Sequence, residues 1–166
     1  MKTTNQLLFL LAIVGLMSCK NQLHVVTLYV NTEDIQKGKE EESANFDQPV
    51  GIENKNFITN VRKGERIIWQ GQSISNAKDI VKITSIEIKP EEGEEIFKLK
   101  PFKSIKVNGD PVGIEGSDEL IRAKVTSGPG RDEAYIIQEY TIEFTVFNEG
   151  VKRNGTFKID PVMKAY

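Results

Sequence analysis

The sequence predicts an all-β fold, built as an antiparallel β-sandwich of about seven to eight strands. In most apolar segments hydrophobic and polar residues alternate with a period of two, which is the pattern of strands with one buried face. Turn residues interrupt the chain at intervals of roughly 8–12 residues, as they do in sandwiches and barrels. Hydrophobic residues make up 39% of the 166 residues, which is enough for a packed core in a single domain.

The first half of the chain is expected to hold four strands and one long acidic connection. The first strand has β-favouring residues at consecutive positions, so we expect it to be buried on both faces. The connection, residues 31–56, is rich in Glu, Lys and Gly and indicates a solvated loop or tether, with a short helix around Ile35. Strict alternation in the strand expected at 80–88 puts Val81 and Ile83 on one face and Ile86 on the other. The four strands are expected at 24–30, 57–61, 66–69 and 80–88.

The second half contains the longest predicted strand, residues 134–147. Asn154-Gly155 is a strong two-residue hairpin signal, and it predicts a last strand that runs antiparallel to the longest one. Asn108-Gly109 is expected to form another tight turn. The remaining strands of this half are expected at 96–100, 104–107, 120–125 and 156–160.

The N-terminus has the features of an export signal. Lys2 precedes an apolar run over residues 7–17, which is too short to span a bilayer, and the run ends in Leu16-Met17-Ser18-Cys19. This ending resembles the lipobox of bacterial lipoproteins. The resemblance implies that a signal peptide, residues 1–18, is removed and that Cys19 carries fatty acyl chains such as palmitate, which anchor the chain to a membrane. An ordinary cleaved signal with a chance Cys, or an N-terminal membrane anchor, is the alternative.

The proposed organisation follows from that junction. After the signal peptide, residues 19–56 comprise the lipidated N-terminus, the first strand and the acidic loop or tether, and residues 57–166 form the main body of one sandwich. Lys20 follows the Cys where lipoproteins of the inner membrane often carry Asp, which favours an outer-membrane location in the cell envelope.

Two further resemblances concern the sandwich. The run from Tyr140 to Val146, followed by a strand that ends in Ile159-Asp160-Pro161, resembles the closing hairpin of small bacterial immunoglobulin-like sandwich proteins such as the DP-EP family. The segment 61–69 resembles a strand–turn–strand piece of cupredoxins. Copper sites of that family need two His, one Cys and usually one Met, whereas this chain has one His and one Cys in total. We therefore expect the shared architecture without copper, and an immunoglobulin-like fold without the disulfide of true immunoglobulin domains.

Composition argues against several functions. The net charge is −2 at pH 7, which gives no attraction to a phosphate backbone, so we expect no nucleic-acid binding. His24 lies close to the anchor without a nucleophile signature and is expected at the surface or at a strand edge. No catalytic residue and no cofactor is assigned. The acidic group Glu91, Glu92, Glu94 and Glu95 leaves a carboxylate-based hydrolase, or an accessory of one, as the alternative function.

The leading hypothesis is a non-catalytic, lipid-anchored module that binds a surface protein or a glycan through loops of the sandwich. Trp69 is the only Trp, and amides and a hydroxyl follow it directly, so an aromatic edge beside polar groups is a candidate site at one end of the sandwich. The alternative is that Trp69 belongs to the core, as a Trp at the end of a strand more often does. A metal is not expected, although a Gly-rich loop offers oxygen ligands suited to a hard cation. The candidate ligand-binding residues are Trp69, Gln70, Gln72, Arg131 and Asp132, and the candidate cation ligands are Asp110, Asp118 and Glu119.

Overall fold

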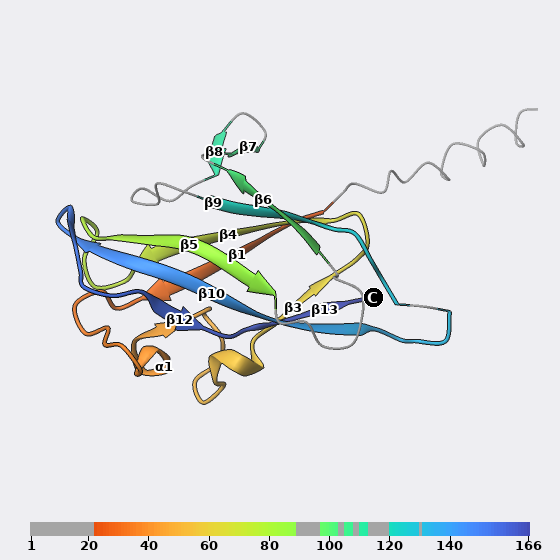
Figure 1. The fold of residues 1–166 in the computed structure, drawn as a ribbon, viewed down its shortest axis with the longest axis horizontal. Coiled ribbons are helices and arrows are strands. Elements are labelled where there is room, and N and C mark those ends of the chain that lie inside the picture. The colour runs from red at the N-terminus through yellow and green to blue at the C-terminus, as the bar shows by residue number, and fades with distance from the viewer. Residues whose placement is uncertain (1–21, 89–96, 103–104, 108–109, 113–119, 130) are drawn as a thin grey trace, which may run out of the picture.

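The protein is mostly β-structure, as the sequence predicts. The structure, a computed structural model, describes residues 22–88, 97–102, 105–107, 110–112, 120–129 and 131–166 (Figure 1). These residues hold thirteen strands, one four-residue α-helix and one short 3-10 helix. Most of the strands belong to two sheets, and β7 (Ile105–Val107) and β8 (Asp110–Val112) form a separate small pair.

The first sheet has five strands in the order β2-β1-β4-β9-β6. Strand β1 runs parallel to β4 over its whole length, from the pair Leu23–Arg66 to the pair Val30–Ser73. The other pairs of this sheet are antiparallel. Its strands are β1 (Leu23–Val30), β2 (Ala44–Asn45), β4 (Arg66–Ser73), β6 (Phe97–Phe102) and β9 (Leu120–Val125).

The second sheet is organised around β10, the longest strand. Strands β11, β12, β13 and β5 all pair with β10 in antiparallel fashion, and β3 runs parallel to β13. Figure 1 shows β10 extending along the length of the sandwich. The strands of this sheet are β3 (Ile58–Val61), β5 (Ile80–Ile88), β10 (Ile136–Asn148), β11 (Val151–Lys152), β12 (Phe157–Ile159) and β13 (Val162–Ala165).

The core lies between the two sheets. The alternate β10 residues Tyr140, Ile142, Phe144 and Val146 are fully buried, which confirms the apolar face that the period of two predicts. From the opposite sheet, Trp69 packs edge-to-face on Tyr140 with ring centroids 5.6 Å apart, and its indole Nε1 donates a hydrogen bond of 3.1 Å to the Tyr140 hydroxyl. This contact joins the two sheets at their centre, and burial raises the pKa of Tyr140 to about 12.

The two sheets approach each other closely at Gly71 of β4. A Cβ atom at this position would lie 2.4 Å from Val81 Cγ1 and 2.5 Å from the backbone oxygen of Val81. Because the Val81 backbone oxygen is one of the clashing atoms, a change in the Val81 rotamer cannot relieve the clash. Gly71 therefore lets β4 pass against β5 at this crossing.

The prediction that all strand pairs are antiparallel is wrong at two places, β1 with β4 and β13 with β3. After β1 the chain crosses to the second sheet, where it forms β3, and it then returns as β4 beside β1. A long crossover of this kind makes the two flanking strands parallel. The sheets are therefore mixed, and the period-two pattern does not distinguish the two directions.

A bulge changes the predicted faces of β5. Glu143 pairs with Ser85, whereas the next residue, Phe144, pairs with Ile83, so that Thr84 is the extra residue on β5. The inserted residue reverses the alternation, and Ile86 joins Val81 and Ile83 on the buried side. The prediction that Ile86 lies on the opposite face is wrong for this reason.

The N-terminal third departs from the sequence prediction in two ways. Strand β1 buries only one face, since Val26, Leu28 and Val30 are buried while Val25 is 44% exposed. The acidic connection places Ile35 and Phe46 in the core, and its helix, α1 (Glu40–Ser43), lies after Ile35 instead of around it. Large apolar side chains spaced along a charged segment thus fix residues 31–56 against the sandwich.

The C-terminal hairpin uses a different turn from the one predicted. The two-residue turn between β10 and β11 is Glu149-Gly150, with φ angles of 46° and 86°. Both angles are positive, as the twist-matched two-residue hairpin requires. Asn154-Gly155 instead connects β11 to β12, which pairs antiparallel with β10 as expected. The last strand is β13, which follows Pro161.

Several predictions concern residues outside the described ranges. These are the signal peptide 1–18 with Cys19, the turn at Asn108-Gly109, the acids Glu91, Glu92, Glu94 and Glu95, and the candidate ligands Asp118 and Glu119. Among the described residues, no helix has the length and apolar character needed to cross a membrane.

Candidate binding surface

Two of the predicted ligand-binding residues lie inside the protein. Trp69 is fully buried between the sheets, and Gln70 is 5% exposed and donates a hydrogen bond of 2.9 Å to Thr27 Oγ1 on β1. The amides after Trp69 belong to the continuing strand β4 and not to a loop. Neither side chain is accessible to a ligand, because Trp69 belongs to the core and Gln70 is buried beside it in the same strand.

The other three predicted residues do not form one site. Gln72 pairs with Tyr29 near the end of β4, whereas the segment that contains Arg131 and Asp132 follows β9, whose last residues pair with the start of β4. Arg131 and Asp132 are exposed and Gln72 is half-buried. The structure therefore places the two groups toward opposite ends of the sandwich.

Metal binding finds no geometric support in the part of the chain that the structure describes. No three His, Cys, Asp or Glu side chains of the described residues converge. Asp110 lies on β8. His24 is half-buried on β1, where its Nε2 lies 2.7 Å from Glu65 Oε2 in the turn before β4.

A hollow that the sequence did not predict lies beside the end of β1. It has a volume of about 500 Å³ and is lined by one continuous part of the chain, from the helix α1 to the 3-10 helix η1 (Asn54–Asn56). One wall is β2, which pairs with Tyr29 and Val30. The lining residues are Glu41, Ala44, Asn45, Asp47, Gln48, Pro49, Val50, Gly51, Ile52, Glu53 and Asn54.

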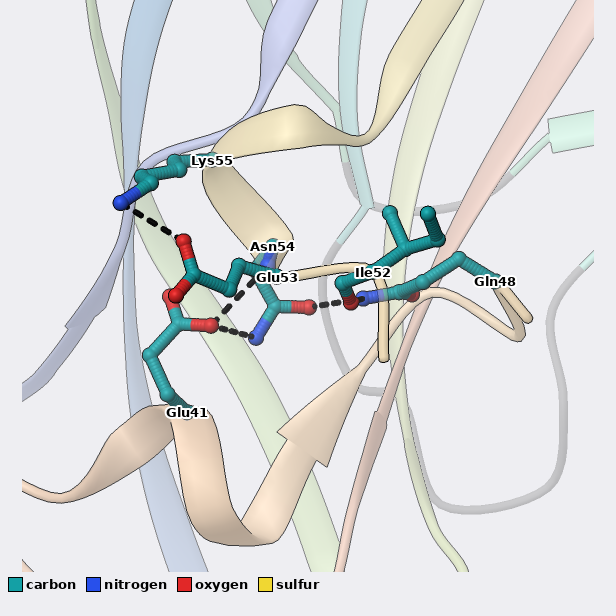
Figure 2. Close-up of polar contacts among 6 residues, drawn as sticks. All are labelled: Glu41, Gln48, Ile52, Glu53, Asn54 and Lys55. Carbon is teal, nitrogen blue, oxygen red and sulfur yellow. Dashed lines mark hydrogen bonds and ion pairs between the residues drawn. The ribbon is translucent and has the colours of Figure 1, made fainter. Parts of the chain in front are cut away.

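Asn54 is the buried residue that holds this loop together. Its side-chain Nδ2 donates to Glu41 Oε2 at 2.9 Å and to the Ala44 carbonyl at 2.8 Å, and its backbone N–H donates to the same Glu41 oxygen at 2.9 Å. Figure 2 shows Glu41 of α1 facing Asn54 across these contacts. Since Asn54 is 1% exposed and its amide group is satisfied, the base of the loop has a defined shape.

Gln48 extends the network across the loop. Its Nε2 donates to Asn54 Oδ1 at 2.7 Å and to the Ile52 carbonyl at 3.1 Å, while its Oε1 accepts from the Phe46 backbone N–H at 2.6 Å. In Figure 2 the Gln48 side chain spans the loop between Ile52 and Asn54. The turn residues Asp47 and Gly51 have φ angles of 62° and 91°. Side-chain amides thus replace backbone pairing in a segment without a sheet partner.

The rim of the hollow is acidic and its tip is apolar. Glu41, Asp47 and Glu53 line it, and Glu53 forms an exposed ion pair of 2.6 Å with Lys55. The hydrogen bond from Lys55 to Glu53 and the negative charge of Glu53 raise the pKa of Lys55. Val50 is fully exposed and Ile52 is 45% exposed. The arrangement is suited to binding, because it presents fixed polar groups beside exposed apolar side chains on a rigid support.

Sequence reasoning missed this surface because the charge of residues 31–56 indicated a solvated tether. The signals that point to an ordered loop are local. Ile35 and Phe46 are large apolar residues that need a core to pack in, and Phe46 stacks on Phe57 with ring centroids 4.6 Å apart. The partners of Asn54 cannot be read from the sequence, because nothing in a residue's identity tells a buried amide from an exposed one.

Comparisons with known proteins leave the family of this chain open. No family model and no curated protein matches it. Among solved structures, the chain is similar to an inclusion body protein, PixA, from Burkholderia cenocepacia J2315, with a TM-score of 0.49, 11% sequence identity and coverage of 90% of this chain and 98% of that one. The solution structure of amebosin matches with a TM-score of 0.29 and 13% identity, covering 68% and 91%. Neither similarity supports an inference about function.

Proposed function

We propose that this chain is a lipid-anchored protein of the cell envelope, on the outer membrane, whose β-sandwich is a non-catalytic binding module. Its contact surface is the hollow at residues 41–54, and its ligand is a protein segment at the cell surface or in the envelope. The finer fold assignment, an immunoglobulin-like sandwich with mixed sheets, is part of this proposal. Two packed sheets and the resemblance of the closing hairpin support it.

The observation that carries the proposal is a loop held rigidly in an open shape. The side chain of the buried Asn54 makes three hydrogen bonds that fix the base of the loop, while Val50 and Ile52 stay exposed at its tip. Preorganised polar groups and exposed apolar side chains reduce the ordering cost of binding. The hollow is thus better suited to a partner than to solvent alone.

The chemistry of the lining favours a protein over a glycan. None of the eleven lining residues is aromatic, so no ring is available to stack on a sugar. Glu41, Asp47 and Glu53 carry three negative charges against the positive charge of Lys55, which is paired with Glu53, so the remaining charge favours a partner with Lys or Arg. The exposed Val50 and Ile52 favour an apolar residue beside it. A basic segment with one apolar anchor is therefore the partner that fits.

The hydrolase alternative has less support at this surface. A glycosidase needs two carboxyl groups that face each other across the scissile bond. Here Glu41 accepts hydrogen bonds from Asn54, and Glu53 is paired with Lys55. No observation at the hollow favours hydrolysis over binding.

The binding proposal is tested by site-specific photo-crosslinking in cells. A photoreactive residue at Val50 is expected to give an adduct with one envelope protein, and the crosslinked peptide is expected to be basic. Val151 of β11 is the matched control, because it is also exposed, at 72%, but lies in the β10–β11 hairpin outside the hollow. Asn54→Ala is expected to reduce the Val50 adduct. Equal adducts from both positions, or an acidic crosslinked peptide, would contradict the assignment of the surface.

The anchor is tested separately by mass spectrometry of the N-terminal peptide. If Ser18-Cys19 is the processing site, the protein from membranes begins at Cys19 and carries a diacylglyceryl group on its thiol. Detection of an unmodified Cys19 in membrane-bound protein would show that the lipid-anchor assignment is wrong, and it would leave the hollow unaffected.

A further inference from the structure

The end of the sandwich where β1 begins collects several chain segments, which we call the tether end. The Arg66 backbone N–H donates to the Gln22 carbonyl at 3.0 Å, and the Tyr166 backbone N–H donates to the Val61 carbonyl at 3.0 Å. Gly128 lies against Lys63 and Tyr166. Figure 1 shows the start of β1, the end of β3 and the C-terminus on the same side of the molecule, opposite the β10–β11 hairpin.

This tether end is basic although the whole chain is acidic, with a net charge of −2. The described residues there include six cations and three acids, and one of the acids, Glu65, accepts hydrogen bonds from His24 and from the Arg62 backbone N–H. The cations are Arg62, Lys63, Arg66, Lys124, Arg131 and Lys164, and the acids are Glu65, Asp132 and Glu133.

The far end has the opposite character. It lies where β1 stops, next to α1 and the β10–β11 hairpin. Its described acids outnumber its cations, so the net charge differs in sign between the two ends of β1. The acids are Glu33, Asp34, Glu40, Glu41, Glu42, Asp79 and Glu149, and the cations are Lys37, Lys39, Lys78, Lys152 and Arg153.

Exposed aromatic and apolar side chains accompany the cations of the tether end. Tyr135 and Tyr166 are 44% and 49% exposed, with ring centroids 6.3 Å apart, and Lys164 Nζ lies 3.7 Å above the Tyr135 ring. On β10, Ile137 pairs with Lys164 and is 49% exposed. Tyrosine beside lysine is typical of the boundary between lipid headgroups and water, because the ring is apolar and its hydroxyl is polar.

A hollow of about 290 Å³ opens beside Tyr166. It is lined by Gln22, His24, Asn60, Val61, Arg62, Glu65 and Tyr166. Arg62 and Asn60, whose side chains can donate hydrogen bonds, are exposed at its rim. The hollow therefore offers space and donors for a headgroup beside Arg62, and the Glu65 carboxylate that also lines it already accepts hydrogen bonds from His24 and the Arg62 backbone N–H.

We propose that the tether end docks on the surface of a bilayer that carries anionic phospholipids. The proposal rests on the lipid anchor proposed above. Only residues 20–22 separate Cys19 from β1, and three residues with the bond that follows them span at most about 14 Å. That length keeps the cations of the tether end within about one to two Debye lengths of the headgroups. The acidic far end, with α1, then faces away from the membrane.

The test uses the mature chain, residues 19–166, with Cys19→Ser so that no lipid is attached. Sedimentation with vesicles that contain about one third phosphatidylglycerol is compared with vesicles of phosphatidylcholine alone. The chain is expected to bind the anionic vesicles, and added salt is expected to release it. Equal binding to both kinds of vesicle, or no binding to the anionic ones, would overturn the proposal.

A pair of matched variants locates the binding face. The triple change Arg62→Gln, Lys63→Gln and Arg131→Gln removes three exposed cations of the tether end, each of which contributes about a fivefold factor near an anionic surface, so the loss is about a hundredfold. The control, Lys37→Gln, Lys39→Gln and Lys78→Gln, changes the net charge equally at the far end. An equal loss in the control would show that the tether end is not the docking face. Because this chain carries no lipid, the result does not depend on whether Cys19 is acylated.

Discussion

The sandwich around β10 and the loop at residues 41–54 each contain a buried polar residue with several partners, but those partners lie at different distances along the chain. Asp79 accepts from Thr32 Oγ1 at 2.7 Å, from Asn148 Nδ2 at 2.6 Å and from the Glu149 backbone N–H at 3.0 Å, and these residues are 47, 69 and 70 positions away. The partners of Asn54 are 6 to 13 positions away.

This difference separates global from local stability. The contacts of Asp79 close the far end of the sandwich and join segments from both halves of the chain, so their loss affects the whole fold. The contacts of Asn54 close one loop, which can open while the sheets stay intact. Substitutions in the two regions are therefore expected to differ in how much of the molecule they destabilise.

The largest effect is expected at the centre of the sandwich. Phe144 is fully buried and packs on Phe157 with ring centroids 5.4 Å apart, so Phe144→Ala should lower the free energy of unfolding by about 3–5 kcal/mol. Glu143 on the other face is the control, because its bonds to Ser85 and Lys158 are partly exposed to water. Glu143→Ala should cost about 1 kcal/mol or less. Equal denaturation midpoints for the two variants would show that the assigned face is wrong.

Asp79→Ala should cost about 3 kcal/mol, because it leaves the buried Thr32 hydroxyl and the donors of Asn148 and Glu149 without their acceptor. Hydrogen exchange should rise in both sheets together. Asp132→Ala, at an exposed position, should stay within about 0.5 kcal/mol of the parent. A loss of protection confined to the residues around Asp79 would contradict a global role.

The ionisation of Asp79 predicts that the stability of the fold depends on pH in the acidic range. Burial alone would raise the pKa of Asp79, but the hydrogen bonds from Thr32, the Glu149 N–H and Asn148 outweigh it, so its pKa lies below the ordinary 3.8. The ionised form therefore contributes stability above pH 3.8, and this contribution is lost as the pH falls through the lower value of the folded state. The difference between the parent and Asp79→Ala should shrink in that range, as measured by urea unfolding.

A smaller effect is expected at alkaline pH. Burial raises the pKa of Tyr140 from 10 to about 12, so the unfolded chain loses this proton first and stability falls as the pH rises from 10 through 12. The expected loss is about 2 kcal/mol. Tyr140→Phe removes the titrating group, and its stability should fall less over the same range. Parallel curves for the two proteins would show that Tyr140 ionises freely.

The smallest change in global stability is expected at the loop. Asn54→Ala should cost about 1 kcal/mol, since water can replace the lost partners of Glu41 and Gln48 at the surface. Hydrogen exchange should accelerate at the amides of Asn54 and Phe46, while the amides of β10 keep their protection. Simultaneous loss of protection in β10 would remove the distinction between the two regions.

The strand positions were largely predictable, because alternation requires only neighbouring residues. Strand β10, with its buried face from Tyr140 to Val146, follows from the spacing alone. The pairing direction of β1 and β4 depends on the route of the chain between them, and the bulge at Thr84 depends on the register against β10. Both are long-range properties that no local pattern contains.

The candidate surface was less predictable than the fold. The choice of Trp69 rested on the idea that an aromatic residue beside amides marks a loop, yet β4 continues through Gln70 and buries both. The hollow at residues 41–54 depends on which amide is buried, and Asn54 is buried among its hydrogen-bond partners Glu41, Ala44 and Gln48. In residues 31–56 the large apolar Ile35 and Phe46 indicate a folded loop in spite of the charge of the segment.

The parallel pairing of β1 with β4 also has a mechanical consequence. A pull on the residues before β1, with the far end of the sandwich held by a partner, acts along the strand and not across it. The ladder from Leu23 to Val30 is then loaded in shear, so that its hydrogen bonds must fail together instead of opening one at a time. A strand attached in this way resists extraction by force better than the terminal strand of a hairpin of equal length.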